Sequence, residues 1–201
     1  ASTVVLLRDT DNGMETLMLK RNKALMFAGG LWVFPGGALE DSDIESAEGD
    51  IALAARIAAA REAEEECGLR PDTDNMVHLS HWTTPVVEPK RFETWIYAAP
   101  LAEDADVAID GSESHDFAWI RVQDAVAQHE AGEFGMLPPT YITLLSLLRY
   151  TTTADMAAGE NEIPPPYVFP VFTKAEGKMD GLFPGDAGYE TCNGSIAGAR
   201  H

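Results

Sequence analysis

The sequence predicts an α/β fold, a sandwich of helices around a mixed β-sheet. Three observations lead to this prediction. Short runs of aliphatic, β-branched and aromatic residues precede one long helix-forming stretch, similar runs follow it, and further helix-forming stretches come late in the chain. A length of 201 residues suits one domain with a sizeable core.

The N-terminal part of the chain is expected to supply the first strands. Residues 2–8 and 16–20 are short aliphatic and β-branched runs, and the polar segment DTDNG between them predicts a hairpin. Residues 31–37, LWVFPGG, form a third apolar run, which Pro35 and two glycines bring to an end.

The next stretch is the strongest helix candidate in the chain. After a polar, acidic insert at residues 38–49, Asp50 is a suitable N-cap for IALAARIAAAREAEEEC, in which alanine, leucine, arginine and glutamate dominate. Gly68 then supplies a C-terminal stop. The sequence therefore predicts one long helix between these two residues.

Two strands and two helices are expected after this helix. Residues 92–101, FETWIYAAPL, and 115–122, HDFAWIRV, are rich in aromatic and β-branched residues and are interpreted as strands. The segments VQDAVAQHEAG at 122–132 and PTYITLLSLLRY at 139–150 are interpreted as helices.

The last quarter of the chain has a weaker pattern. From about residue 152 it contains the stiff, turn-rich segments IPPPYVFP and GLFPGDAGYE, without repeats or a low-complexity tract. We therefore expect residues 1–151 to form the domain and residues 152–201 to form an ordered extension packed on it.

Composition excludes several classes of function. The net charge of −19, from 14 basic and 33 acidic residues, argues against binding to nucleic acid or to an anionic membrane, because both need a cationic surface. No apolar run approaches the roughly 18 residues of a membrane helix. The N-terminal ASTVVLLRDT reads as a first strand rather than a signal peptide, so we expect a cytoplasmic protein. Cys67 and Cys192 show no metal-ligand spacing and are expected to be free thiols.

The C-terminal end of the predicted long helix carries an unusual concentration of negative charge. Glu62, Glu65 and Glu66 stand at i, i+3 and i+4 and share one helical face, whereas Glu64 points elsewhere. Such a run is either a solvated acidic face or a set of ligands. Three carboxylates on one face offer the hard oxygen atoms that Mg²⁺ prefers.

The residues around these glutamates resemble the end of the Nudix box. Arg61-Glu-Ala-Glu-Glu-Glu-Cys-Gly-Leu69 fits its pattern of Arg-Glu-apolar-x-Glu-Glu-x-Gly-apolar at every fixed position. The resemblance implies a Nudix-type α/β/α sandwich. It also implies a hydrolase that cleaves diphosphate linkages in nucleoside diphosphate derivatives by in-line attack of metal-activated water, with Mg²⁺ or Mn²⁺ as cofactor.

The resemblance assigns roles to particular residues. In the family a glycine of the Gly-Gly turn lends a carbonyl oxygen to the metal, and here that glycine is Gly37. A carboxylate from a later loop often joins the site, and Glu113 is the first choice for it, Asp116 the second and His115 the third. The implied metal ligands are Gly37, Glu62, Glu65, Glu66 and Glu113, and the implied catalytic residues are Glu65, Glu66 and Arg61. Arg61 is expected to fork onto a neighbouring carboxylate and fix its rotamer.

The first half of the box departs from the family pattern. An insert separates Gly37 from Arg61, and Leu53 stands where the family has a glutamate that is mainly a structural partner of the arginine. Glu48 and Asp50 are the two candidates for the replacement carboxylate.

The insert, together with WVFPGG, RFETWIY, LPPTYITLLSL and LFPGDAGY, looks like the branch typified by the peroxisomal coenzyme A diphosphatase and its bacterial relatives. The coenzyme A signature upstream is incomplete, because Met26 stands where an arginine is expected. Scarce cations beside predicted strands are candidate phosphate contacts, and aromatic residues are candidates for stacking on adenine, although aromatic residues on strands more often belong to the core. The candidate substrate-binding residues are Arg21, Lys23, Lys90, Arg91 and Trp32.

Two other functions remain open from the sequence. One is an ADP-ribose or NADH pyrophosphatase, and the other is a non-catalytic Nudix-fold module that binds a nucleotide. The expected partner is a small-molecule nucleotide, with no nucleic acid and no membrane, and a homodimer is left open.

Overall fold

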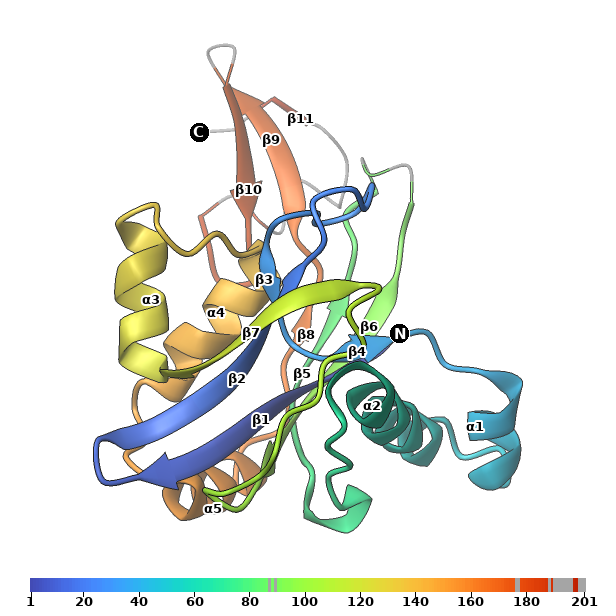
Figure 1. The fold of residues 1–201 in the computed structure, drawn as a ribbon. Coiled ribbons are helices and arrows are strands. Elements are labelled where there is room, and N and C mark those ends of the chain that lie inside the picture. Colours follow the sequence, from blue (N-terminus) through green and yellow to red (C-terminus); the bar gives the residue numbers. More distant parts are fainter. Residues whose placement is uncertain (87, 89, 176–177, 188, 190–196, 199–201) are drawn as a thin grey trace.

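An eight-stranded mixed sheet forms the centre of the computed structural model, which describes the chain except for residues 87, 89, 176–177, 188, 190–196 and 199–201 (Figure 1). Its strands are β1 (Ser2–Thr10), β2 (Gly13–Arg21), β3 (Trp32–Val33), β4 (Gly36–Gly37), β5 (Val77–Thr83), β6 (Glu93–Pro100), β7 (Ser114–Arg121) and β8 (Tyr167–Val168). The order is β3-β2-β1-β6-β5-β8, with β4 paired to β1 and β7 paired to β2. The sheet is mixed, because β1 runs parallel to β6 and antiparallel to β2. The predicted α/β class is confirmed.

The predicted N-terminal hairpin is present. β1 and β2 pair antiparallel, with Leu7 opposite Thr16 and Thr10 opposite Gly13. Alternate residues of β1 serve different cores: Val4 and Leu6 belong to one buried cluster, while the residues between and after them belong to the other. This two-residue period is the one that a strand buried on both faces requires.

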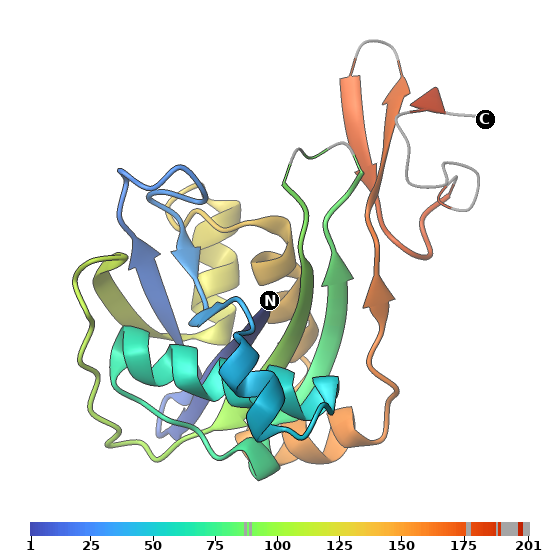
Figure 2. The same ribbon diagram turned by 90° about the vertical axis from the view of Figure 1, so that its right-hand side faces the viewer.

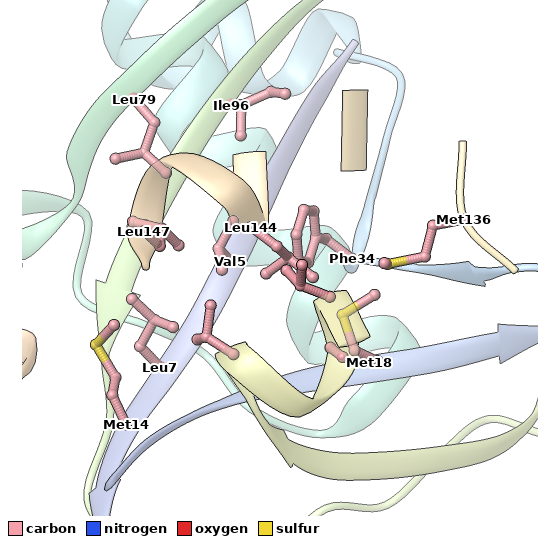
Figure 3. Packing of buried hydrophobic residues seen from close by; sticks show 14 of the residues in the cluster. Val5, Leu7, Met14, Met18, Phe34, Leu79, Ile96, Met136, Leu144 and Leu147 are labelled. Atoms are coloured by element: carbon pink, nitrogen blue, oxygen red, sulfur yellow. The ribbon is translucent and has the colours of Figure 1, made fainter. Parts of the chain in front are cut away.

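Helices cover both faces of the sheet (Figures 1 and 2). The helices are α1 (Asp41–Ser46), α2 (Ile51–Cys67), α3 (Val122–Glu130), α4 (Pro138–Leu147) and α5 (Thr153–Asn161). A short 3₁₀ turn spans Thr73–Asn75. α2 supplies one of the two buried clusters, and α3, α4 and α5 supply the other. Figure 3 shows the second cluster, in which Leu144 and Leu147 of α4 pack near Val5 and Ile96 of the sheet.

The long helix α2 begins and ends where the sequence predicts. The Asp50 side chain accepts hydrogen bonds from the amides of Ala52 and Leu53, and Gly68 adopts a left-handed φ of 73° at the C-cap. The face toward the sheet consists of small side chains, which let the helix lie close to the strands; its buried alanines are Ala54, Ala55, Ala58, Ala59, Ala60 and Ala63.

The acidic insert is folded as well. It contains α1, a helix that the sequence interpretation did not assign. The side chains of Glu40 and Asp43 form a capping box at its N-terminus, which satisfies two backbone amides of the first turn. Acidic and small residues dominate this stretch, so it has little apolar periodicity. A search for periodic hydrophobic residues therefore does not detect the helix.

Part of the expected extension is built into the main body. Met156 of α5 is fully buried, and β8 pairs parallel to β5 with His81 opposite Tyr167. Phe183 packs edge-on against Trp82, with ring centroids 5.9 Å apart. The strands β9 (Val171–Ala175), β10 (Lys178–Leu182) and β11 (Ala197–Gly198) form a second sheet that rises from this body (Figure 2).

Two further expectations can be compared with the described residues. Cys67 is a free, buried thiol, as expected, whereas Cys192 lies outside the described residues. Burial raises the pKa of Cys67 to about 11. No helix in the described part of the chain is long and apolar enough to span a bilayer.

Candidate functional site

The C-terminal half of α2 lies against the Gly36–Gly37 turn. The buried Glu66 carboxylate accepts a hydrogen bond from the Gly36 amide at 3.4 Å. A Cβ atom at Gly37 would collide with the carboxylate of Glu62, which would have to move to another rotamer. A Cβ atom at Gly36 would collide with the backbone of Ser2 and Thr3 on β1, so Gly36 is required by the close approach of this turn to the sheet.

Glu113 reaches the same place from a distant part of the chain. It directly precedes β7, and its carbonyl oxygen accepts a hydrogen bond from the Asn22 amide at 2.8 Å. Its carboxylate pairs with Arg21 at 3.4 Å. Its negative charge is among the causes that raise the pKa values of both Glu62 and Glu66, and its place among the metal ligands stays a prediction.

Glu66 has the most perturbed carboxyl group of the site. Burial, followed by the negative charges of Glu62 and Glu113, raises its pKa to about 8. The Gly36 amide and the Arg21 charge oppose this rise but do not cancel it. Burial likewise raises the pKa of Glu62, which Arg61 partly offsets. Both carboxylates thus lie in a setting that a nearby cation would stabilise strongly.

Arg61 organises the acidic residues around it. Its guanidinium makes two hydrogen bonds to Asp43, at 3.2 and 3.0 Å, and one to the carbonyl oxygen of Ala38 at 3.0 Å. It also donates to Glu62 at 3.0 Å and to Glu65 at 3.4 Å. The hydrogen bonds to Asp43 raise the arginine pKa further above its ordinary value. The expected role of Arg61, fixing a neighbouring carboxylate, agrees with this geometry.

Asp43 supplies the carboxylate that the first half of the box lacks. It is only 2% exposed and forms the two-point contact with Arg61. Burial opposes its ionisation, but hydrogen bonds from Arg61 and from the Glu40 amide outweigh burial and lower its pKa.

The two candidates that the sequence analysis named for this carboxylate do not occupy that position. The Asp50 side chain serves as the N-cap of α2. Glu48 is exposed and adopts a left-handed conformation with φ of 52°. Asp43 was missed because it lies on α1, a helix that was not predicted. The one available signal was the Glu-x-x-Asp spacing of its capping box.

The two remaining glutamates of the run point away from the buried pair. Glu65 is 59% exposed and pairs with Arg61, while Glu64 pairs with Arg70 on the outer surface. The expectation that Glu64 points elsewhere is confirmed. Glu65 lies at the rim of the site, where a substrate and its water can reach it.

The resemblance implies a divalent cation, and the donor set suits one. Glu62, Glu66 and Glu113 are hard oxygen ligands whose charges already interact, and a cation would remove their mutual repulsion. In the described part of the chain, however, no group of three or more acidic, histidine or cysteine side chains is arranged so that it could hold a metal ion. Arg61 holds Glu62 and Glu65 instead. These side chains would need to turn from Arg61 to bind a cation together with Glu66.

The alternatives to Glu113 lie farther along the same segment. His115 and Asp116 are both exposed, and Asp116 accepts a hydrogen bond from the amide of Phe117. Glu113 is among the leading charges that raise the pKa values of Glu62 and Glu66. The order of preference among the three residues stays a prediction.

Of the expected substrate contacts, Arg21 reaches the acidic site and Trp32 is buried in the core. Trp32 is 9% exposed, stacks on Phe134 with centroids 4.4 Å apart, and has Lys20 over its ring. Little of its ring is free for a ligand, so we do not carry it forward as a substrate contact. Lys23, Lys90 and Arg91 are exposed.

Comparisons with known proteins identify the family of this chain. A model of the NUDIX domain family matches residues 1–141. The Caenorhabditis elegans protein named nudix hydrolase 7 is 25% identical over 225 residues, covering 94% of this chain and 74% of that protein.

Two solved structures share the fold. The NUDIX hydrolase of Alicyclobacillus acidocaldarius has a TM-score of 0.70 at 22% identity and covers 78% of this chain and 94% of that chain. The NUDIX domain of Shewanella oneidensis NrtR, in complex with ADP-ribose, has a TM-score of 0.54 at 18% identity and covers 81% of this chain and 86% of that chain. With the family match spanning most of the chain and including the acidic helix and its glycine turn, this chain belongs to the Nudix family and is a hydrolase acting on pyrophosphate bonds.

Proposed function

We propose that this hydrolase cleaves the diphosphate linkage of coenzyme A or an acyl-coenzyme A, with Mg²⁺ or Mn²⁺ as cofactor. One observation carries the chemistry: the carboxylates of Glu62, Glu66 and Glu113 interact at a site that Arg21 borders. Groups that bind a cation and a group that binds phosphate are thus side by side. The choice of coenzyme A rests on the resemblance of segments along nearly the whole chain, including the insert that contains Asp43.

The residues divide the work as follows. Glu62, Glu66, Glu113 and the backbone of Gly37 hold the cation, which when bound would neutralise phosphate oxygens and lower the pKa of a water molecule. Glu65, exposed at the rim, either completes this ligand set or accepts the proton of the attacking water. Arg61 orients the carboxylates through its contacts with Asp43 and Glu62.

The cations of the chain provide the substrate contacts. Arg21 is 19% exposed and faces the acidic site, which suits a contact to the diphosphate. Lys23 and Arg91 are exposed and suit contacts to a further phosphate, such as the 3′-phosphate of coenzyme A. In a chain of net charge −19, such cations are needed to bring a polyanion to the site.

A second candidate is hydrolysis of ADP-ribose or NADH. It is supported by the ADP-ribose bound to the NrtR domain, which shares this fold. A module that only binds nucleotides is less well supported, because binding alone needs no such set of glutamates beside an arginine.

Products formed in ¹⁸O-water test the proposal. With Mg²⁺ or Mn²⁺, coenzyme A should give 3′,5′-ADP and 4′-phosphopantetheine, with the label in a phosphate of one product. Acyl-coenzyme A should give the corresponding acylphosphopantetheine. Label in a free acyl carboxylate would mean thioester hydrolysis and refute the mechanism. If coenzyme A is untouched while ADP-ribose gives AMP and ribose 5-phosphate, the second candidate is correct.

A further inference from the structure

Two exposed phenylalanine rings meet at one end of the molecule. Phe27 lies in the segment between β2 and β3, and Phe92 lies just before β6; they are 61% and 36% exposed. Their ring centroids are 6.2 Å apart, with the planes tilted by 54°. Single exposed apolar side chains are common, but two exposed rings brought together from segments about 65 residues apart form an apolar surface of the kind that marks binding sites.

Phe27 is tied to the candidate active site through Arg21. The Arg21 side chain donates from Nε to the carbonyl oxygen of Phe27 at 3.3 Å and pairs through Nη1 with Glu113 at 3.4 Å. The backbone of Arg21, at the start of the segment, is also hydrogen-bonded to its end: the Arg21 amide donates to the Leu31 carbonyl oxygen, and the Gly30 amide donates to the Arg21 carbonyl oxygen. The ring of Phe27 is therefore carried by a segment whose base is anchored to the acidic cluster.

Phe92 is held with similar firmness on the other side. Its carbonyl oxygen accepts a hydrogen bond from the Thr84 amide at 2.9 Å, and its amide donates to the Thr84 hydroxyl at 3.0 Å. These contacts join the two ends of the connection between β5 and β6. The two rings thus lie on two neighbouring segments, each held in place by hydrogen bonds.

One cation lies over a ring of this pair, and two others belong to the same two segments. The Lys90 ammonium lies 5.2 Å from the centre of the Phe92 ring, and Lys23 extends along Gly30 close to Phe27 in the chain. Arg91 donates to the carbonyl oxygen of Thr84 at 3.0 Å. Aromatic faces for stacking and cations for phosphate are the two features that bind a nucleotide.

We propose that Phe27 and Phe92, defined here as the aromatic corner, bind the nucleobase of the substrate, and that Lys90 and Lys23 bind its neighbouring phosphate. This inference rests on the proposed function, because it places the base end of the substrate beyond Arg21 and the diphosphate between Arg21 and the glutamates. A base can stack on one ring and meet the edge of the other at the observed tilt. The aromatic corner is therefore proposed for the stacking role that the sequence suggested for Trp32, which is buried.

Binding of 3′,5′-ADP to the metal-free protein, measured by calorimetry in EDTA, tests the aromatic corner without catalysis. Phe27→Ala and Phe92→Ala should each weaken binding by about fivefold to a hundredfold, the range for loss of one base–aromatic stack. Phe27→Tyr, which keeps an aromatic ring, should bind 3′,5′-ADP as the wild type does. Inorganic pyrophosphate should bind all variants equally. Phe117→Ala is the matched control, since Phe117 is 38% exposed but lies on β7, and it should leave the affinity unchanged.

Lys90→Ala tests the phosphate contact. It should weaken binding of 3′,5′-ADP more than binding of 5′-AMP, because only the first ligand carries the additional phosphate. Equal losses for both ligands would remove Lys90 from the proposal.

Three outcomes would overturn the aromatic corner. Unchanged affinity for 3′,5′-ADP in both alanine variants would show that the rings do not touch the base. Equal loss in Phe117→Ala would show a general effect on folding. A change of molecular mass in solution on Phe27→Ala would show that the rings join two copies of the chain. If coenzyme A is not hydrolysed but adenine nucleotides still require both rings, the aromatic corner stands and only the proposed substrate fails.

Discussion

At the scale of single residues, Asp43 is the position on which the arrangement of Arg61 depends. Asp43→Asn keeps the shape of the side chain but removes the charge that Arg61 faces, so the variant should lose about 1–3 kcal/mol of stability, because the half-buried Arg61 loses a two-point, charge-assisted contact and keeps only its weaker partners. Turnover should fall as well, since Arg61 would then pair more strongly with Glu62 and hold that carboxylate away from the cation. Thermal unfolding and steady-state kinetics measure both effects. Glu48→Gln is the control, because Glu48 is exposed, and equal losses in the two variants would show that Asp43 has no special role.

Glu66 and Glu65 differ in burial but should both be essential for turnover. Glu66→Gln and Glu65→Gln should each lower kcat by several orders of magnitude with the fold intact, because each removes a ligand or a base rather than a core contact. Glu64→Gln is the matched control on the outer surface and should keep normal kcat. Near-normal turnover of either variant at saturating metal would remove that residue from the site.

The raised pKa of Glu66 predicts a pH dependence of stability for the metal-free protein. Because its folded-state pKa of about 8 exceeds the ordinary carboxyl value, the folded state binds more protons than the unfolded state between these two values. Stability in EDTA should therefore fall as the pH rises from about 5 to 8. Glu66→Gln should remove most of this fall and stabilise the protein at pH 8 by on the order of 3 kcal/mol. Urea unfolding across this range measures it, and a wild-type curve that is flat or rises would contradict the assignment.

At the scale of elements, α2 depends on its cap and on the turn that faces it. Asp50→Ala removes the acceptor for two amides of the first turn and should cost about 1 kcal/mol of stability. It should leave kcat unchanged, because the acidic residues lie at the opposite end of the helix. Chemical denaturation and kinetics together separate the two effects. A large loss of turnover would mean that Asp50, rather than Asp43, serves the site.

Several elements of the core were predictable, but β5 of the central sheet, α1 of the insert and β8 were not assigned from the sequence. The hairpin of β1 and β2 and the whole of α2 follow from apolar runs, turn residues and caps, which act locally in the sequence. α1 and β8 do not follow, because each depends on a partner far along the chain. β8 is defined by its pairing with β5, and α1 buries Asp43 against Arg61.

At the scale of the whole molecule, the proposed metal binding can be tested through stability. Mg²⁺ or Mn²⁺ should raise the melting temperature of the wild type, because a ligand that binds the native state alone stabilises it. The rise should shrink in Glu62→Gln and persist in Glu64→Gln. Differential scanning fluorimetry over millimolar metal measures both. An equal rise in the two variants would indicate screening of the overall charge of −19 rather than a site.

The sequence by itself determined the family resemblance, the acidic face of α2 and the identity of the chemistry, because these reside in the order of residues within one helix. Only the tertiary structure decided which distant groups complete the site. It buried Asp43 beside Arg61, brought Glu113 to Arg21, withdrew Trp32 into the core and set Phe27 against Phe92. The physical reason is that the pairing of a charge or a ring across the chain depends on where the strands place it. Local patterns of polarity carry no information about that placement.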